Sequence, residues 1–177
     1  IGANIEPVYL NADMLESRLE IPEGRQCSEK TLQAAQELGL DFICLTGNPG
    51  TGVTNNAIVK AIELAKKHFS GLIIAGKMHG AGVNEPICDL KTIEEFIDAG
   101  ADIILVPAVG TVPAFTEEQL ISIVNCAHEK GALVLTAIGT SQEGSSSAVI
   151  EQFGLKNKVC GVDIQHIGDA GYSGLCL

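Results

Sequence analysis

Apolar and polar positions repeat along this chain in a unit of 29 to 31 residues. Short apolar runs, each the length of one buried strand, begin at Phe42, Leu72, Ile103, Leu133 and Val162, and an earlier run, IGANIEPV, opens the chain. Between them, apolar residues recur three and four positions apart, the period of an amphipathic helix, at 28–38, 55–68, 91–98, 117–130 and 146–156. Strands and helices that alternate in this way predict βαβ units and a parallel sheet covered on both faces.

Signals at the ends of the helices support these boundaries. Ser28 and Thr116 stand where an N-cap belongs, and acidic residues follow each of them in the first turn. A glycine lies just before four of the strands, at Gly39, Gly71, Gly100 and Gly131, where glycine commonly ends a helix.

Two architectures fit this order, an open doubly wound sheet and a (β/α)8 TIM-type barrel. Polar residues within the strands favour the barrel, whose lumen can be polar near the top: Asn4 and Glu6 share one face of their strand, as do Lys77 and His79. We therefore predict that residues 1–177 form one partial TIM-barrel domain of about six βα units. Because a closed barrel needs about 200–250 residues, we expect a missing chain segment or a second copy in a homo-oligomer to complete it.

Both architectures bind ligands at the carboxyl ends of their strands. The segments that follow the apolar runs are rich in Gly, Asn, Thr, Ser, Lys and His: NIEP, TGNPGTG, GKMHGAG, PAVGTVP, AIGTSQEG and HIGDAGYSG. The segments that follow the helices show nothing comparable. This asymmetry predicts a ligand site at one rim of the barrel.

The last two of these segments predict an anion site. Backbone N–H groups in glycine-rich turns can converge on a phosphate or carboxylate, and hydroxyl groups add donors. We expect this role for Gly139, Thr140, Ser141, Gly168 and Gly171. The alternative is that both segments are tight turns that need glycine for backbone geometry alone. The segment GNPGTGVTN is a further glycine-rich turn that ends at a possible helix cap, Thr54, and it lacks the Gly-Lys-Ser/Thr of a P-loop.

Three basic side chains are candidates for chemistry at this rim. Lys77 can act as a Schiff-base nucleophile, as a fixed cation for a substrate anion, or as part of a structural ion pair. His79 and His166 can each serve as a general acid or base, or as a structural histidine.

Carboxylates and amides near the same rim add further candidates. Glu6 and Asp169 can move protons, or they can bind a divalent cation together with Asn4 or Asn48. Scattered oxygen ligands do not identify a metal, so the sequence predicts no cofactor and leaves a divalent cation open.

Composition narrows the class of partner. The 177 residues carry a net charge of −11 without a basic stripe, which argues against nucleic acid and an anionic membrane as partners. The six cysteines have no metal-binding or redox spacing, so a reducing cytoplasm is the simplest compartment. These features leave a small anionic metabolite as the expected ligand.

Five segments in order closely resemble a family of uncharacterised bacterial TIM-barrel proteins: LTGNPGTGVTN, IIAGKMHGAGV, GADIILVPAVGTVP, TAIGTSQEG and DIQHIGDAGYSG. Members of this family look longer and often carry names such as phosphoenolpyruvate phosphonomutase or haloacid dehalogenase-like hydrolase. The chain has neither the Asp-x-Asp-x-Thr-type motif of the dehalogenases nor the Lys-Lys-Cys-Gly-His-type loop of the phosphonomutases. The resemblance therefore implies a fold and a site location. The expected function is a lyase or isomerase of a sugar phosphate or keto acid; the alternative is a non-catalytic metabolite sensor or regulatory subunit.

Overall fold

The structure, a computed structural model, describes residues 1–139 and 145–168. Within them the strands are β1 (Gly2–Ile5), β2 (Phe42–Leu45), β3 (Leu72–Gly76), β4 (Ile103–Pro107), β5 (Leu133–Ile138) and β6 (Ile164–Ile167). The helices are η1 (Glu23–Arg25), a short 3-10 helix, and α1 (Glu29–Glu37), α2 (Asn55–His68), α3 (Leu90–Ala99), α4 (Glu117–Glu129) and α5 (Ser147–Val159).

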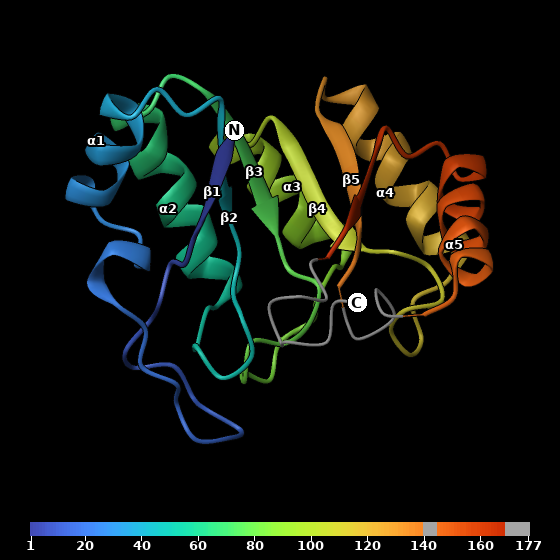
Figure 1. Cartoon of the computed structure of the whole chain (residues 1–177), viewed down its shortest axis with the longest axis horizontal. Coiled ribbons are helices and arrows are strands. Elements are labelled where there is room, and N and C mark those ends of the chain that lie inside the picture. Colours follow the sequence, from blue (N-terminus) through green and yellow to red (C-terminus); the bar gives the residue numbers. More distant parts are fainter. Residues whose placement is uncertain (140–144, 169–177) are drawn as a thin grey trace.

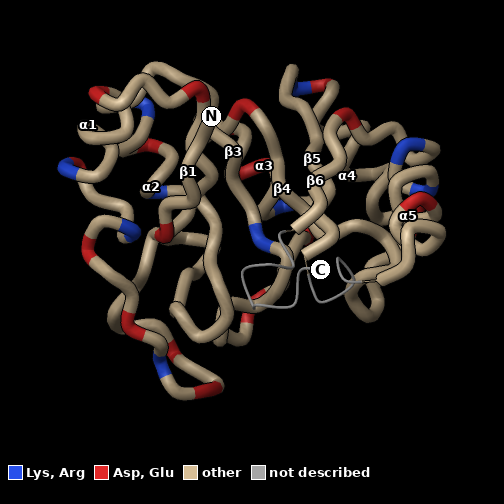
Figure 2. Tube along the Cα trace, in the orientation of Figure 1, with Lys and Arg blue, Asp and Glu red and all other residues tan. Residues whose placement is uncertain are grey.

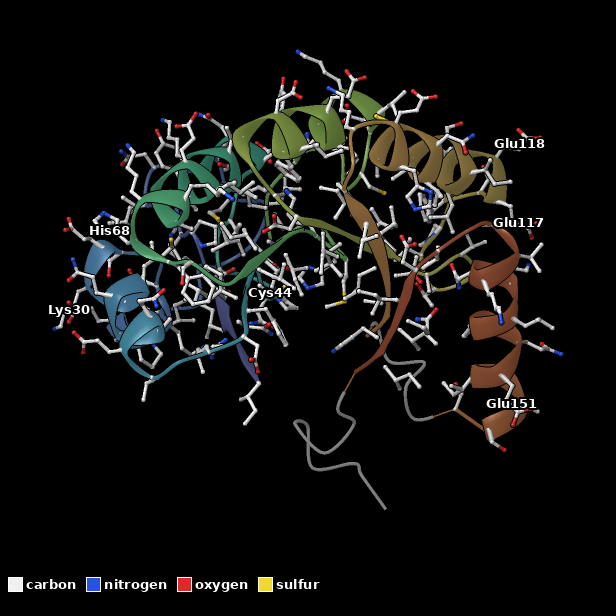
Figure 3. The ribbon with its side chains drawn as sticks, turned by 90° about the horizontal axis from the view of Figure 1, so that it is seen from above. Lys30, Cys44, His68, Glu117, Glu118 and Glu151 are labelled. Carbon is white, nitrogen blue, oxygen red and sulfur yellow. The ribbon has the colours of Figure 1, made fainter. Side chains whose placement is uncertain are left out.

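All the strands run parallel in one sheet, in the order β1-β2-β3-β4-β5-β6. The helices lie along one side of this curved sheet (Figure 1). Seen from above, they form an outer arc around the strands (Figure 3). A strand order without a reversal belongs to a barrel rather than to a doubly wound sheet. The predicted partial (β/α)8 fold is confirmed, and β1 and β6 are the two edges of the described sheet.

The predicted helix starts are also confirmed. Ser28, Thr54 and Thr116 are the N-caps of α1, α2 and α4, and each side chain accepts a hydrogen bond from the backbone N–H three residues further on. Such caps satisfy N–H groups that have no partner inside the helix. Gly100 ends α3 with a φ of 112°, a conformation that favours glycine. Gly71 has another role, because a Cβ at this position would lie 2.6 Å from the ring of Phe69.

Strand side chains alternate between two apolar layers, as the pleat of a strand requires. The convex layer packs against the helices and includes Ile43, Ile73, Ile104 and Val134. The concave layer contains Cys44, Ile74, Ile103, Leu105, Leu135 and Ala137, flanked by Phe42, Met78 and Ile164. Charged residues lie on the helices and loops rather than along the strands (Figure 2).

The last strand begins later than the sequence pattern predicts. The apolar run starts at Val162, but pairing with β5 starts at Ile164. The chain is still turning after α5 at Gly161, where φ is 94°. Val162 therefore packs against the convex layer from outside the strand.

Aspartates connect neighbouring strands at the amino-terminal rim. Asp41, Asp102 and Asp163 directly precede β2, β4 and β6 at intervals of 61 residues. Oδ2 of Asp102 accepts a hydrogen bond from the Ile73 N–H at 2.8 Å, and Oδ2 of Asp163 accepts one from the Val134 N–H at 2.8 Å. The carboxylates of Asp102 and Asp163 thus each satisfy an N–H group near the start of the preceding strand.

Asp163 also contacts His128 of α4, whose Nε2 lies 2.9 Å from Oδ2. Burial alone would raise the pKa of Asp163, but the hydrogen bonds from His128 and the Val134 N–H lower it overall. A carboxyl group whose pKa is lower in the folded protein than in the unfolded chain stabilises the fold at neutral pH. That contribution is lost as the pH falls through the folded-state pKa.

We predict that Asp163→Ala lowers the free energy of unfolding at pH 7 by about 1–3 kcal/mol, because it leaves the Val134 N–H without its partner. The matched control is Asp98→Ala, which removes an exposed ion pair with Lys130 and should change stability by less than about 1 kcal/mol. Urea denaturation at pH 7 and at pH 3 measures both effects, and the difference between the variants should shrink at the lower pH. Equal losses of unfolding free energy in the two variants at pH 7 would contradict a stabilising role for the hydrogen bond between Asp163 and the Val134 N–H.

Candidate ligand-binding site

A cavity of about 670 Å³ occupies the concave side of the sheet. Its lining residues are Gly2, Asn4, Phe42, Cys44, Thr46, Leu72, Ile74, Met78, Ile103, Leu105, Leu135, Ala137, Ile164, Gln165 and His166. None of these described residues is an Asp, Glu, Lys or Arg. The cavity is therefore an apolar space with a few polar side chains, those of Asn4, Thr46, Gln165 and His166, in its lining.

Two of the predicted site residues, Asn4 and His166, line this cavity from the two edge strands. Both residues are exposed, and within the described residues neither side chain makes a hydrogen bond or ion pair. Both are therefore open to a ligand in the cavity.

Thr46 is a site residue that the sequence analysis missed. It follows β2 directly, lines the cavity and is only 4% exposed. Its hydroxyl oxygen has no hydrogen-bond partner among the described residues. Period-two alternation could have identified it, because Thr46 is in phase with Phe42 and Cys44, which also line the cavity.

Glu6 and Asn48, two other predicted site residues, bind each other. Glu6 is fully buried, and its carboxylate accepts hydrogen bonds from the backbone N–H and the side-chain amide of Asn48, both at 2.9 Å. Arg25 adds a third at 2.5 Å. Three donors satisfy the carboxylate and join the end of β1 to the loop after β2. These contacts make Glu6 a structural group. Glu6 nevertheless lies two residues after Asn4, on the face of the strand that the sequence analysis predicted.

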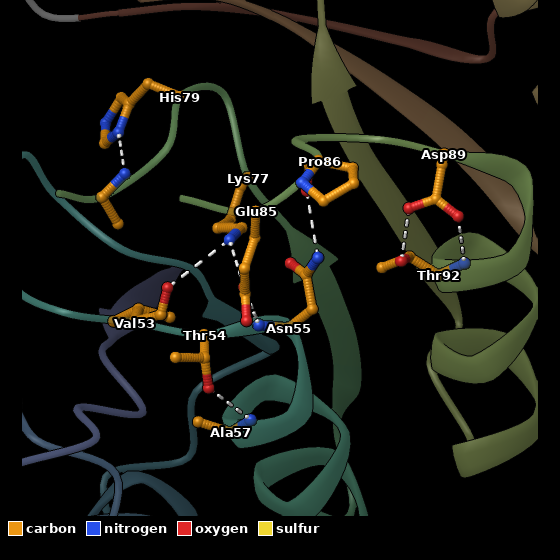
Figure 4. A network of polar contacts seen from close by, with 11 residues as sticks. Val53, Thr54, Asn55, Ala57, Lys77, His79, Glu85, Pro86, Asp89 and Thr92 are labelled. Atoms are coloured by element: carbon orange, nitrogen blue, oxygen red, sulfur yellow. Dashed lines mark hydrogen bonds and ion pairs between the residues drawn. The ribbon is translucent and has the colours of Figure 1, made fainter. Parts of the chain in front are cut away.

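The prediction that Lys77 shares the lumen face with His79 needs correction. Lys77 is fully buried and does not line the cavity. It follows β3 in phase with Ile73 and Ala75, which belong to the convex layer. Its ammonium group lies 3.2 Å from Oε2 of Glu85 and 3.5 Å from the Val53 carbonyl oxygen (Figure 4).

Glu85 connects Lys77 to a helix start, because the same Oε2 accepts a hydrogen bond from the Asn55 N–H of α2 at 2.7 Å (Figure 4). Burial lowers the pKa of Lys77, and the hydrogen bond and negative charge of Glu85 offset this only in part. Of the three roles open from the sequence, the geometry shows the ion pair.

His79 lies in the loop after β3, half-buried, and its Nδ1 accepts a hydrogen bond from the Ala81 N–H at 3.1 Å. Burial and the positive charge of Lys77 lower the pKa of His79, while Glu16 and Glu6 act in the opposite direction. The imidazole is therefore neutral at physiological pH, with Nδ1 already used by its own loop.

The predicted anion site falls only partly on described residues. Thr140, Ser141, Asp169 and Gly171 lie outside them, so their roles stay predictions. The Gly168 N–H donates to the Ile138 carbonyl oxygen at 2.6 Å, which commits it to the sheet. A Cβ on Gly139 would lie 2.9 Å from the sulfur of Met78, so glycine at this position permits the close approach of that side chain.

The third glycine-rich segment is covered by the chain itself. Residues 8–21, part of the long connection after β1, cross the loops that follow β2 and β3. The Leu19 N–H donates to the Gly50 carbonyl at 2.7 Å, and Arg18 donates to the Thr51 carbonyl at 3.1 Å. A Cβ on Gly52 would lie 2.3 Å from the Arg18 guanidinium. Glycine in this loop therefore serves the packing of residues 8–21.

Across residues 1–139 and 145–168, no three His, Cys, Asp or Glu side chains converge as they would around a metal ion. No helix in that part of the chain combines the length and apolar character needed to cross a membrane.

Solved structures of similar fold are TIM-barrel enzymes. A candidate lyase/mutase from Burkholderia cenocepacia J2315 is 20% identical, with a TM-score of 0.56 over 94% of this chain and 54% of its own. A candidate fructose-1,6-bisphosphate aldolase from Coccidioides immitis is 14% identical, with a TM-score of 0.56 over 83% and 55%. GMP reductase from Trypanosoma brucei, in complex with guanosine 5'-triphosphate, is 18% identical, with a TM-score of 0.58 over 85% and 34%.

At these identities the likeness shows the fold alone, and the chain spans about half or less of the length of these proteins. No curated protein matches the sequence significantly. A family model described as a domain of unknown function matches residues 1–177. That description contains no activity, so neither the phosphonomutase nor the dehalogenase label is supported. The chain belongs to the DUF7916 family.

Proposed function

We propose that this protein binds a small phosphorylated or carboxylated metabolite at the carboxyl ends of its strands and acts on it as a lyase or isomerase. One observation carries the proposal: the concave cavity is lined near this rim by Asn4 and His166, two polar side chains without partners among the described residues. Ligand sites of TIM barrels lie at this rim. The lyase/mutase and aldolase structures of similar fold support the reaction class only as analogies.

The roles within the site follow from exposure and chemistry. His166 is exposed and lines the cavity, so its imidazole can give or take a proton from a ligand there. Asn4 can orient a carbonyl or hydroxyl group through its amide. The described cavity wall contains no Lys or Arg side chain. The anionic group therefore belongs at the rim, where the loops after β5 and β6 would supply backbone N–H groups.

A specific observation favours a second candidate, a non-catalytic sensor of the same metabolite. Lys77 and Glu6, two of the strongest candidates for carbonyl and proton chemistry, are fully buried and already paired, with Glu85 and with Arg25 and Asn48. A sensor needs the binding groups alone. The two candidates share the anion site and differ in turnover.

Calorimetry with inorganic phosphate and a panel of sugar phosphates tests the binding site in the full-length protein. We expect Gly171→Leu to lose affinity, because a bulky side chain blocks the close approach of the anion. His166→Ala should keep its phosphate affinity and lose turnover by about 10²–10⁴-fold, the usual contribution of general acid–base catalysis. His68→Ala, on α2, is the control and should change neither quantity. Unchanged binding in Gly171→Leu would mean that this loop is only a turn.

Borohydride trapping with keto-sugar phosphates tests whether Lys77 forms a Schiff base, which a lyase can use and a sensor does not need. The buried ion pair predicts no mass adduct on Lys77, because its amine is not accessible from the cavity. An adduct on wild type that is missing in Lys77→Met would overturn this geometry and support a Schiff-base lyase.

The same variant tests the pKa of Lys77. Because this pKa is lower in the folded protein than in the unfolded chain, unfolding takes up a proton between the two values. The free energy of unfolding should therefore rise with pH in the window below the ordinary lysine value, about 10.4, in wild type but not in Lys77→Met. Denaturant titrations from pH 7 to pH 10 measure the difference, and parallel curves would contradict it.

A further inference from the structure

The hydroxyl group of Thr46 is an exception among the buried threonines of the described chain. The others each use their hydroxyl: Thr51 donates to the Asn48 carbonyl at 2.7 Å, Thr92 to Asp89 at 2.6 Å, Thr111 to the Ala108 carbonyl at 2.6 Å and Thr136 to Gln165 at 2.9 Å. Thr46 is 4% exposed, and its oxygen has no such partner among the described residues. A buried polar atom without a hydrogen bond destabilises a fold.

The residue that carries this hydroxyl lines the cavity. Thr46 lines it at the carboxyl end of β2, in phase with Cys44, whose side chain belongs to the concave layer. Valine has nearly the same shape as threonine and would satisfy the packing there without an unpaired oxygen. The hydroxyl therefore has no structural use that the described contacts show.

The surrounding wall selects what can bind this hydroxyl. Ile74, Leu105 and Ala137 form apolar parts of the lining, and Met78 reaches from the end of β3 to Gly139 after β5. None of the described lining residues is a Lys, Arg, Asp or Glu. Burying an ionised group without a counter-charge is strongly unfavourable. An uncharged group is therefore favoured at Thr46.

We propose that Thr46 is a subsite for an uncharged oxygen of the ligand, a hydroxyl or carbonyl group, held while the adjoining carbon atoms contact the apolar wall. The ligand then has two unlike ends, with the neutral end inside the cavity and the anionic end at the rim. This assignment rests on the proposed metabolite site and specifies which part of the metabolite enters first.

The binding test uses three probes on the full-length protein: inorganic phosphate, propyl phosphate and dihydroxyacetone phosphate. The two organic phosphates share a three-carbon chain, and only the second has a carbonyl and a hydroxyl oxygen. Wild type should bind dihydroxyacetone phosphate about five- to tenfold more tightly than propyl phosphate, the effect of one net hydrogen bond. Thr46→Val should remove this preference and Thr46→Ser should keep it. Affinity for inorganic phosphate should be the same in all three proteins.

Thermal unfolding without ligand supplies a second readout. Thr46→Val should raise Tm by about 2–4 °C, because it removes an unsatisfied buried oxygen. The matched control, Thr136→Val, should lower Tm, because it breaks the hydrogen bond to Gln165. A fall in Tm for Thr46→Val would show that the hydroxyl has a structural partner and would overturn the assignment.

The outcomes separate this assignment from the proposed function. If inorganic phosphate binds and wild type treats the two organic phosphates alike, the Thr46 subsite is wrong and the anion site stands. If none of the probes binds wild type, the proposed metabolite site fails and the subsite fails with it. A preference for dihydroxyacetone phosphate that survives in Thr46→Val would assign the oxygen to another residue.

Discussion

Apolar packing between the convex face of the sheet and its helices is the contact on which the other features depend. Every second strand residue, such as Ile43, Ile73, Ile104 and Val134, lies in this layer. Because side chains alternate along a strand, the same contact turns the remaining residues toward the concave side. It also brings the carboxyl ends of all the strands to one rim of the concave side, which holds the cavity.

Buried polar groups near this rim are bound to partners and are therefore not free to contact a ligand. Lys77 falls in the convex phase, so its ammonium group is enclosed and needs Glu85 as a counter-charge. Glu6 is likewise enclosed and binds Arg25 and Asn48. Both groups join neighbouring loops at the carboxyl ends of the strands. Thr46 differs because it lines the cavity and its hydroxyl has no partner in the described chain.

The long connection after β1 adds a second layer over part of the rim. Residues 8–21 cross the loops after β2 and β3 and occupy their glycine-rich turns through backbone hydrogen bonds and the Arg18 guanidinium. This packing turns a segment that resembles an anion-binding turn into an internal contact. At the other edge of the sheet, His166 of β6 lines the cavity.

The period of the apolar runs was sufficient to predict the parallel fold, the order of its elements and most of their boundaries, because burial on both faces makes each strand a continuous apolar run. Caps such as Thr54 were equally readable, since a cap is a contact within a few residues. The gathering of polar segments at the carboxyl ends of the strands was also readable from the sequence.

The state of each side chain at that rim was decided only by the tertiary structure. Lys77 lies two residues from His79, yet its partner is Glu85 of the loop before α3 and its phase is convex. Glu6 meets Asn48 across 42 residues, and Arg25 comes from a connection with no periodic signal. Such pairs depend on which loops fold over the strand ends, and local patterns do not contain that information. Sequence alone therefore determined the order and parallel pairing of the strands, and long-range packing determined which polar groups at their carboxyl ends are buried in pairs and which are exposed.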